Sequence, residues 1–423
     1  MQTLRDLGNN QNAIHSTSNY FNEDSTQKNT YDNAIDNGST YITGQHNPEL
    51  NKSTIDQTIS RINTAKNDLH GVEKLQRDKG TANQEIGQLG YLNDPQKSGE
   101  ESLVNGSNTR SEVEEHLNEA KSLNNAMKQL RDKVAEKTNV KQSSDYINDS
   151  TEHQRGYDQA LQEAENIINE IGNPTLNKSE IEQKLQQLTD AQNALQGSHL
   201  LEEAKNNAIT GINKLTALND AQRQKAIENV QAQQTIPAVN QQLTLDREIN
   251  TAMQALRDKV GQQNNVHQQS NYFNEDEQPK HNYDNSVQAG QTIIDKLQDP
   301  IMNKNEIEQA INQINTTQTA LSGENKLHTD QESTNRQIEG LSSLNTAQIN
   351  AEKDLVNQAK TRTDVAQKLA AAKEINSAMS NLRDGIQNKE DIKRSSAYIN
   401  ADPTKVTAYD QALQNAENII NAT

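Results

Sequence analysis

The chain contains no cysteine and no tryptophan, and only two of its 423 residues are phenylalanine. Without cysteine, disulfides and thiol chemistry are both excluded, and the redox compartment stays undetermined by that argument. Apolar residues make up only 31% of the chain, against roughly 45 to 50% in an ordinary globular protein when glycine is counted. A large compact core cannot be filled from that supply, whereas thin helical bundles repeated along a line each bury only a narrow apolar stripe.

Long hydrophobic runs and basic patches are also missing. No apolar run approaches the roughly 20 residues that span a bilayer, and the first ten residues, MQTLRDLGNN, lack the basic and apolar regions of a signal peptide. The formal net charge is -18. Nucleic acids and anionic membrane surfaces both favour basic partners. We therefore expect no nucleic-acid binding and no membrane insertion in this chain.

The chain contains an internal sequence repeat with a period of 126 residues. The tripeptide Leu-Arg-Asp begins at Leu4, Leu130, Leu256 and Leu382. Eight of the ten tyrosines form two columns with the same spacing, namely Tyr20, Tyr146, Tyr272 and Tyr398, and Tyr31, Tyr157, Tyr283 and Tyr409. Met1 is in register with Met127, and the final residues, NIINAT, stop inside a unit. We interpret the chain as a piece of a longer array.

The second unit shows most clearly how one repeat is organised. Apolar residues recur every three or four positions over 111–137, which predicts an amphipathic helix, with Ser111 and Glu114 as its capping box. A polar loop is expected over 138–154. A second helix is predicted over 157–171 and is stopped by the sequence Gly-Asn-Pro that follows.

A third helix, capped by Asn177 and Glu180, completes a three-helix bundle. The rest of the unit repeats this plan at smaller size, with helices over 199–215 and 221–233 and a third that begins at Pro237.

The third helix of the small bundle is expected to continue into the next large bundle. No helix breaker occurs between Val239 and Val260, so one unbroken helix should finish one module and begin the next. A helix of about 25 residues spans roughly 37 Å. The sequence therefore predicts an all-α chain, an elongated rod of tandem three-helix bundles joined by shared long helices, on the order of 200 Å long and monomeric.

A catalytic or metal site that belonged to the repeat should recur in the same columns. His15 and His267 share a column with Lys141 and Lys393, and the remaining histidines align with other residue types. These are His46, His70, His116, His153, His199, His281 and His328. A role as exposed helix or loop residues is favoured for all nine. No phosphate-binding glycine loop and no zinc or nucleophile motif occurs. We expect no enzyme, no catalytic residue, no cofactor and no metal.

Three further features allow a functional interpretation, but a structural role is favoured for each. The acidic loop Tyr20–Asp24 could hold a weak calcium ion, but the copy at Tyr146 loses some of its oxygens. The Arg5-Asp6 pair and its copies are expected to form salt links to neighbouring helices rather than to do acid–base work. The tyrosine columns could be binding hot spots, but we favour a role in which they hold the long loop against the bundle, with each hydroxyl finding a partner.

The two module types and their alternation resemble those of a known protein family. The large module carrying YINADPTKVTAYDQALQNAENIINAT (Tyr398–Thr423) resembles a FIVAR module, and the small module carrying LNDAQRQKAIENVQAQ (Leu218–Gln233) resembles a GA module. Alternating at this period over essentially the whole chain, they resemble the giant staphylococcal extracellular matrix-binding surface proteins of the Ebh/Embp type. The resemblance implies an extracellular fibre on the bacterial cell surface or cell wall that binds host fibronectin or another matrix protein and contributes to biofilm and envelope integrity.

On this resemblance the chain is divided into seven modules. The FIVAR-like modules are 1–71, 123–197, 249–323 and 375–423, and the GA-like modules are 72–122, 198–248 and 324–374. Two functions remain open: an adhesin whose FIVAR-like modules bind matrix at many weak sites, and a spacer or envelope strut without a tight ligand. Which residues would contact a ligand is unknown. Albumin or immunoglobulin binding by the GA-like modules is disfavoured, because their second helices differ sharply in sequence between copies.

Overall fold

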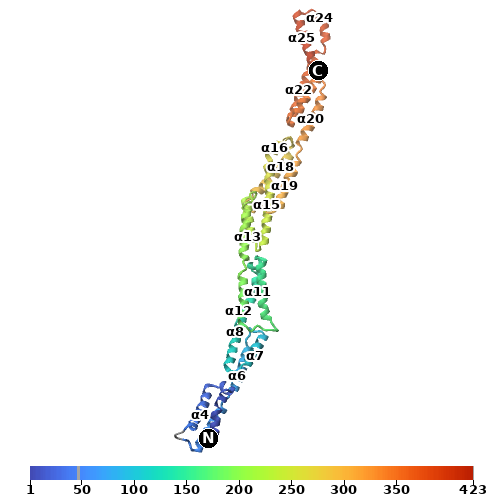
Figure 1. Cartoon of the computed structure of the whole chain (residues 1–423). Coiled ribbons are helices and arrows are strands. Elements are labelled where there is room, and N and C mark those ends of the chain that lie inside the picture. The colour runs from blue at the N-terminus through green and yellow to red at the C-terminus, as the bar shows by residue number, and fades with distance from the viewer. Residues whose placement is uncertain (45–47, 423) are drawn as a thin grey trace. The chain divides into compact units, whose positions relative to one another are not determined.

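The computed structural model describes residues 1–44 and 48–422. His46, Asn47 and Thr423, the last residue of the final expected module, lie outside the described residues. Every regular element in the described part of the chain is a helix (Figure 1), which confirms the all-α prediction. The chain divides into two compact units, Met1–Glu203 and Ala204–Thr423, and each is described by itself.

Unit 1 begins with a large module, continues with a small module and ends with a second large module. The long helices of the first large module are α1 (Gln2–Asn9), α4 (Ser25–Thr43) and α5 (Lys52–Asn67), with α2 (Gln11–His15) and α3 (Ser18–Phe21) between them. The small module is formed by α6 (Gly71–Gly87), α7 (Asp94–Gly106) and the first half of α8 (Arg110–Ala135). The second large module contains the second half of α8, α9 (Lys137–Gln142), α10 (Ser144–Ile147), α11 (Thr151–Asn169) and α12 (Lys178–Asn193), and α13 (Gly197–Ile212) follows.

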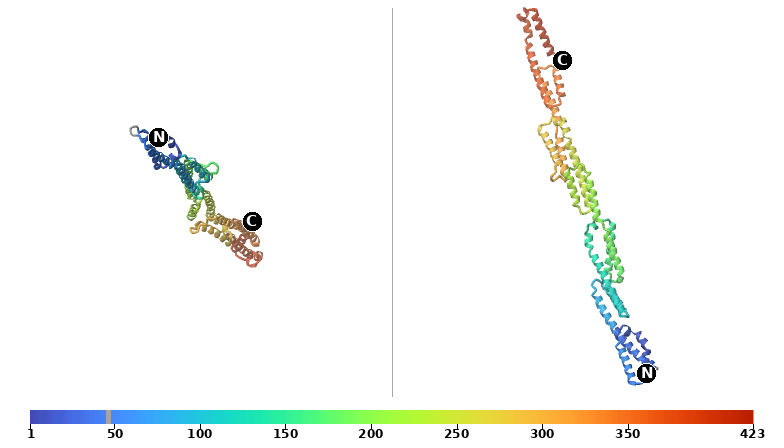
Figure 2. Two further views of the ribbon diagram at one scale, coloured as in Figure 1. Left: turned by 90° about the horizontal axis from the view of Figure 1, so that it is seen from below. Right: turned by 90° about the vertical axis from the view of Figure 1, so that its left-hand side faces the viewer.

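Unit 2 begins within the second small module at α13 and continues with a large module, a third small module and a last large module. Its helices are α14 (Asp220–Gln231), α15 (Ile236–Gly261), α16 (Gln263–His267), α17 (Ser270–Phe273), α18 (Glu277–Asp295), α19 (Lys304–Thr319), α20 (Gly323–Glu339), α21 (Thr346–Gln358), α22 (Arg362–Ile386), α23 (Lys389–Arg394), α24 (Ser396–Ile399) and α25 (Pro403–Ile420). Within each module the long helices pack side by side, as α1, α4 and α5 do at the blue end of the chain in Figure 2.

The shared helix is confirmed. α15 runs without a break from Ile236 to Gly261, with Pro237 in its first turn, and it packs on α14 of the small module and on α18 and α19 of the next large module. α8 and α22 repeat this arrangement. The predicted capping box of α8 was placed two residues too late, because Thr109 accepts from the Glu112 amide and the Glu112 side chain accepts from the Thr109 amide.

The predicted polar loop of the large module was wrong. Residues 137–147 form two short helices, α9 and α10, and α11 already begins at Thr151, six residues before its first apolar position. The side chains of Ser143 and Ser150 cap α10 and α11. The segment was read as a loop because it is polar. Serine caps and one buried contact, Val140, are sufficient to order such short helices against a bundle.

The cores of successive modules within a unit are in contact with one another. The core of the second large module is built on Leu123, Leu130, Tyr157 and Leu188, and it also takes in Leu92 from the loop between α6 and α7 of the small module before it. Leu218 enters the third large module in the same way, and Leu344 enters the fourth. Each small module therefore supplies one leucine to the core of the large module that follows it.

Candidate functional site

Each large module contains a tyrosine pair with a shared aspartate. In the second large module the Tyr146 hydroxyl donates to Asp158 at 2.9 Å, and its ring packs edge-on against buried Tyr157. The same bond joins Tyr20 to Asp32, Tyr272 to Asp284 and Tyr398 to Asp410. The first tyrosine lies on a short helix and its partners lie on the second long helix. The tyrosines therefore hold the short helices against the bundle, as the sequence predicts.

A histidine or lysine side chain completes each of these clusters. His15 Nε2 lies 2.7 Å from an oxygen of Asp32, and the imidazole stacks on the Tyr20 ring with centroids 4.1 Å apart. His267 repeats both contacts, and Lys141 and Lys393 pair with the equivalent aspartates. The expectation that His15 and His267 are merely exposed surface residues was wrong. The column that mixes histidine with lysine places a polar partner beside the aspartate carboxylate in each module.

The cluster is arranged for packing rather than for proton transfer. Burial, followed by the hydrogen bond to Asp32, raises the pKa of Tyr20 to about 12. The hydroxyl therefore stays protonated and donates to the carboxylate at any ordinary pH.

The acidic loop that was considered for calcium is occupied by the chain's own cations. Glu23 is buried and pairs with Lys74, while Asp24 lies 2.6 Å from Lys74 and 2.7 Å from Arg110. Arg110 also contacts Asp78 at 2.5 Å. The two cations come from the small module, so this network forms the large–small joint, where a large module meets the small module after it.

Unit 2 carries the same network between Glu275, Asp276, Lys326, Asp330 and Arg362. Burial opposes the ionisation of Glu275, but the Lys326 ammonium and the amides of Ser322 and Asp276 outweigh it and lower the pKa of Glu275 to about 2. The corresponding positions after the second large module are Ser150, Leu200, Ala204 and Ile236. Four of the five charged positions of the network are lost together there, and Asp149 alone keeps a carboxylate.

A glycine column marks the same joint. A Cβ atom on Gly71 would lie 2.5 Å from the carbonyl oxygens of Ser18 and Asn19, and Gly197 and Gly323 have backbone atoms equally close. These three glycines begin the first helix of each small module, so only glycine allows that helix to approach the short helix of the preceding module this closely.

The sequence Leu-x-x-Leu-Asn, at Leu215–Asn219 and at its copies beginning at Leu89 and Leu341, forms the small–large joint. This is where a small module meets the large module after it. Asn219 Oδ1 caps α14 by accepting from the Gln222 amide at 2.8 Å, while its Nδ2 donates to the carbonyls of Ile294 and Lys296 at 2.9 and 3.1 Å. Gln222 also donates to the carbonyl of Ile301. One asparagine thus caps the beginning of a small-module helix and the end of a large-module helix.

The arginine of Leu-Arg-Asp belongs to this joint as well. Arg131, Arg257 and Arg383 donate to the backbone carbonyls of Tyr91, Ala217 and Ser343. The predicted salt link to a neighbouring helix was wrong for the arginine, because its partner is a loop carbonyl. Asp132 pairs with Lys128 on its own helix.

One apolar column remains exposed in all four large modules. The residue after the first tyrosine is Phe21, Ile147, Phe273 or Ile399, and these are 41, 48, 40 and 67% exposed. They lie at the end of a short helix beside the large–small joint. In unit 2 a groove of about 560 Å³ adjoins Phe273 and is lined by Leu327 and His328. The repeat shows that this position is always Phe or Ile, but the spacing alone does not distinguish exposed from buried apolar residues.

Each small module also buries one carboxylate. Glu100 on α7 and Glu352 on α21 are buried at one position, where the second copy has Ala226. Asp246 on α15 is buried at another, where the other copies have Ala120 and Ala372. In all three carboxylates one oxygen has no hydrogen-bond partner within the described residues. Each small module therefore buries one carboxylate, which lies on the second helix in the first and third modules and on the third helix in the second module.

No helix in the described part of the chain is both long enough and apolar enough to cross a membrane.

Comparisons with known proteins identify the two module types. The FIVAR domain profile matches residues 1–70, 126–196, 252–322 and 378–423, and the GA module profile matches 72–126, 198–252 and 324–378. The large modules are thus FIVAR modules and the small ones GA modules. Neither is an enzyme family.

The chain is similar to long staphylococcal proteins. It is 35% identical over 411 residues to the extracellular matrix-binding protein ebh of Staphylococcus aureus strain MRSA252, which covers 97% of this chain and 4% of that protein. It is 34% identical over 423 residues to EbhA of strain Mu3, covering 100% of this chain and 6% of that protein. A crystal structure of the 756–1003 domain of S. aureus EbhA superposes with a TM-score of 0.54 at 25% identity, covering 58% of this chain and 98% of that one.

Proposed function

The chain belongs to the family of FIVAR- and GA-module extracellular matrix-binding proteins, and we propose that it is an adhesin segment whose FIVAR modules bind host matrix, with fibronectin as the ligand, at many equivalent sites. The segment then works outside the cell, on the bacterial surface and attached to the cell wall. Because it spans only 4 to 6% of those two relatives, the activity of any whole protein is part of the proposal.

The observation that carries this proposal is the exposed apolar column of Phe21, Ile147, Phe273 and Ile399. A large exposed apolar residue costs solubility, and its recurrence in every FIVAR module, at least 40% exposed each time, is typical of a contact surface. Four weak sites on one chain give avidity that a single site lacks.

The test is retention of the whole chain on immobilised fibronectin. Replacing the four column residues by serine together should weaken binding by at least roughly 100-fold, because avidity multiplies weak sites by about 10² to 10⁴. Replacing Phe273 alone should have a much smaller effect. The matched control replaces two exposed leucines of the GA modules, Leu245 and Leu355, by serine and should leave retention unchanged. Equal losses in the two sets, or no retention of the wild type at any fibronectin density, would contradict the proposal.

A structural spacer or envelope strut is the second candidate, and the joints favour it. Two kinds of joint tie modules together through buried ions, shared caps and continuous helices, and such joints transmit force whether or not a ligand is bound. Pulling single chains separates the two functions: a strut unfolds module by module at forces that soluble fibronectin does not change, whereas a ligand bound to the FIVAR modules raises their unfolding force.

A further inference from the structure

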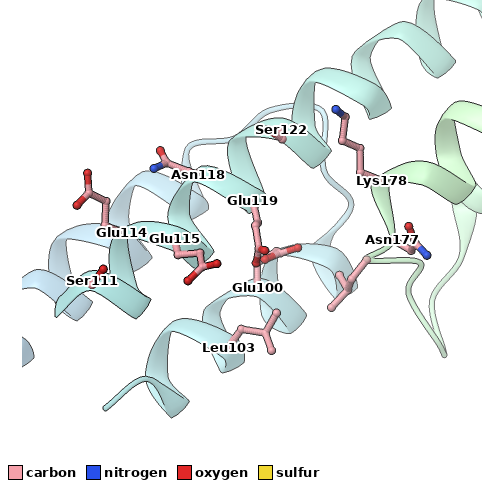
Figure 3. Close-up of a pocket in the computed structure, with 11 residues that line it drawn as sticks. Glu100, Leu103, Ser111, Glu114, Glu115, Asn118, Glu119, Ser122, Asn177 and Lys178 are labelled. Carbon is pink, nitrogen blue, oxygen red and sulfur yellow. The ribbon is translucent and has the colours of Figure 1, made fainter. Parts of the chain in front are cut away.

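The first GA module borders a pocket whose counterpart beside the second GA module contains Glu248 and Lys304 but has no carboxylate at the positions of Glu100 and Glu119. It lies between α7, α8 and the segment that leads into α12, and it measures about 840 Å³. Glu100 and Leu103 line it from α7, Glu115 and Glu119 from α8, and Leu176 and Lys178 close one end. Figure 3 shows the carboxyl group of Glu100 beside that of Glu119 inside the pocket.

Glu100 is the unusual member of this group. The residue is only 2% exposed, and its Oε2 has no hydrogen-bond partner within the described residues, although it lines the pocket. Burial, and then the charge of Glu119, raise the pKa of Glu100 to about 7, while His116 acts in the opposite direction. A buried carboxylate without a partner costs free energy that a bound cation would recover.

The chain's own cations do not fill this role. Lys178, at the end of the pocket, lies 3.3 Å from Glu182 on its own helix. His116 Nδ1 lies 3.1 Å from Oε2 of Glu119, and no hydrogen bond or ion pair joins it to Glu100 within the described residues. Glu114 and Glu115 add further negative charge around the opening. The pocket is therefore acidic, partly apolar and without an internal counter-ion for Glu100.

We propose that this pocket binds a lysine or arginine side chain of a protein partner, with Glu100 and Glu119 contacting the cationic group and Leu103 and Leu176 packing on its aliphatic stem. A long basic side chain combines these two requirements, because its methylene groups pack on apolar surface while its head forms charge-assisted hydrogen bonds. A metal ion suits the pocket less well. No group of three or more metal-ligating side chains converges in the described parts of the chain, and calcium takes six to eight oxygen ligands.

The other GA modules serve as controls within the same molecule. The second has Ala226, Gln241 and Leu245 at the positions of Glu100, Glu115 and Glu119, and the third keeps Glu352 but has Gln367 and Ala371. A buried carboxylate alone is thus present in the third module, whereas the pair is present only in the first. The proposal therefore predicts one site per chain.

The test is calorimetric titration of the whole chain with capped tetralysine at pH 7, in two buffers of different ionisation enthalpy. We expect one site per chain and release of a fraction of a proton on binding, because the cation stabilises ionised Glu100. Glu100→Gln should bind at least about tenfold more weakly, the loss expected for one charge-assisted hydrogen bond, and should release no proton. Glu119→Gln should also weaken binding.

Glu352→Gln is the matched control, since it removes the same charge from the equivalent position of the third module, and it should bind tetralysine as the wild type does. Glutamine preserves the volume of the side chain, and helical circular dichroism verifies the fold of each variant. Equal affinity of Glu100→Gln and wild type, absence of binding at millimolar peptide, or displacement of the peptide by calcium at the same stoichiometry would each overturn the proposal.

Discussion

The small–large joint makes a quantitative prediction at Asn219. The Asn219→Ala variant loses the cap of α14, which is worth about 1 kcal/mol. It also loses two hydrogen bonds to the carbonyls of Ile294 and Lys296, each worth about 1 kcal/mol. The cap contribution of about 1 kcal/mol should be lost from the start of α14, and the contribution of the two hydrogen bonds, about 2 kcal/mol, from the end of α18.

The assay is hydrogen exchange of the whole chain, read by mass spectrometry on peptides from α14 and from the last turn of α18. Exchange resolves individual segments, whereas global unfolding of a repeat array is not a two-state process. Where opening is local, losses of about 1 and 2 kcal/mol correspond to roughly 5-fold and 30-fold faster exchange. Both peptides should be affected in Asn219→Ala.

A second substitution separates the two roles. Serine keeps an acceptor for the Gln222 amide but is too short to reach the carbonyls of α18, so Asn219→Ser should retain protection at the start of α14 and lose it at the end of α18. Asn206→Ala, on the exposed face of α13, is the control and should change neither peptide. The coupling argument fails if Asn219→Ala affects α14 alone, or if the serine variant protects α18 as well as the wild type does.

Three other predictions follow from the joints and the buried carboxylates. Gly323→Ala places a Cβ within 2.6 Å of backbone atoms of α17 and should cost roughly 1–3 kcal/mol in protection of α17 and α20. The control Gly80→Ala lies in open space on α6 and should stabilise that helix by about 0.5–1 kcal/mol. Equal effects of the two variants would refute the close-approach argument. The lowered pKa of Glu275 means that the folded state binds fewer protons than the unfolded state. Ionised Glu275 therefore stabilises the third large–small joint fully above the unfolded pKa of about 4.3, and this stabilisation is lost as the pH falls toward 2. Glu275→Gln should remove that part of the pH dependence of α20 protection. The raised pKa of Asp246 has the opposite sign, so Asp246→Asn should stabilise the second GA module at pH 7 and lose its advantage below about pH 4, and a variant less stable than wild type at pH 7 would contradict this.

Some features of this protein follow directly from local sequence. Apolar spacing of three and four residues located the long helices of the second repeat, and the absence of a breaker between Val239 and Val260 correctly predicted α15 as one helix. Pro237 and Asn177 were correctly read as helix-start signals. These are properties of neighbouring residues along the chain, so the sequence states them directly.

Exact columns at 126 residues also identified which positions are structurally fixed, but not what they contact. Asn219, Arg257 and the glycine column were visible as repeats, while their partners lie some 40 to 80 residues away and are mostly backbone carbonyls that leave no trace in the identity of the partner residue. The short helices were missed for a related reason, because a polar segment becomes helical here through caps and a few tertiary contacts.

The sequence by itself determined the long helices, the period and the alternation of two module types, since each depends on local spacing and on copies that can be compared. Only the tertiary structure decided that Phe21 and its equivalents are exposed, that the acidic loop is neutralised by Lys74 and Arg110, and that Glu100 lies in a pocket without a counter-ion. Burial and charge pairing depend on which helices pack against each other, and identical spacing along the chain is compatible with either outcome.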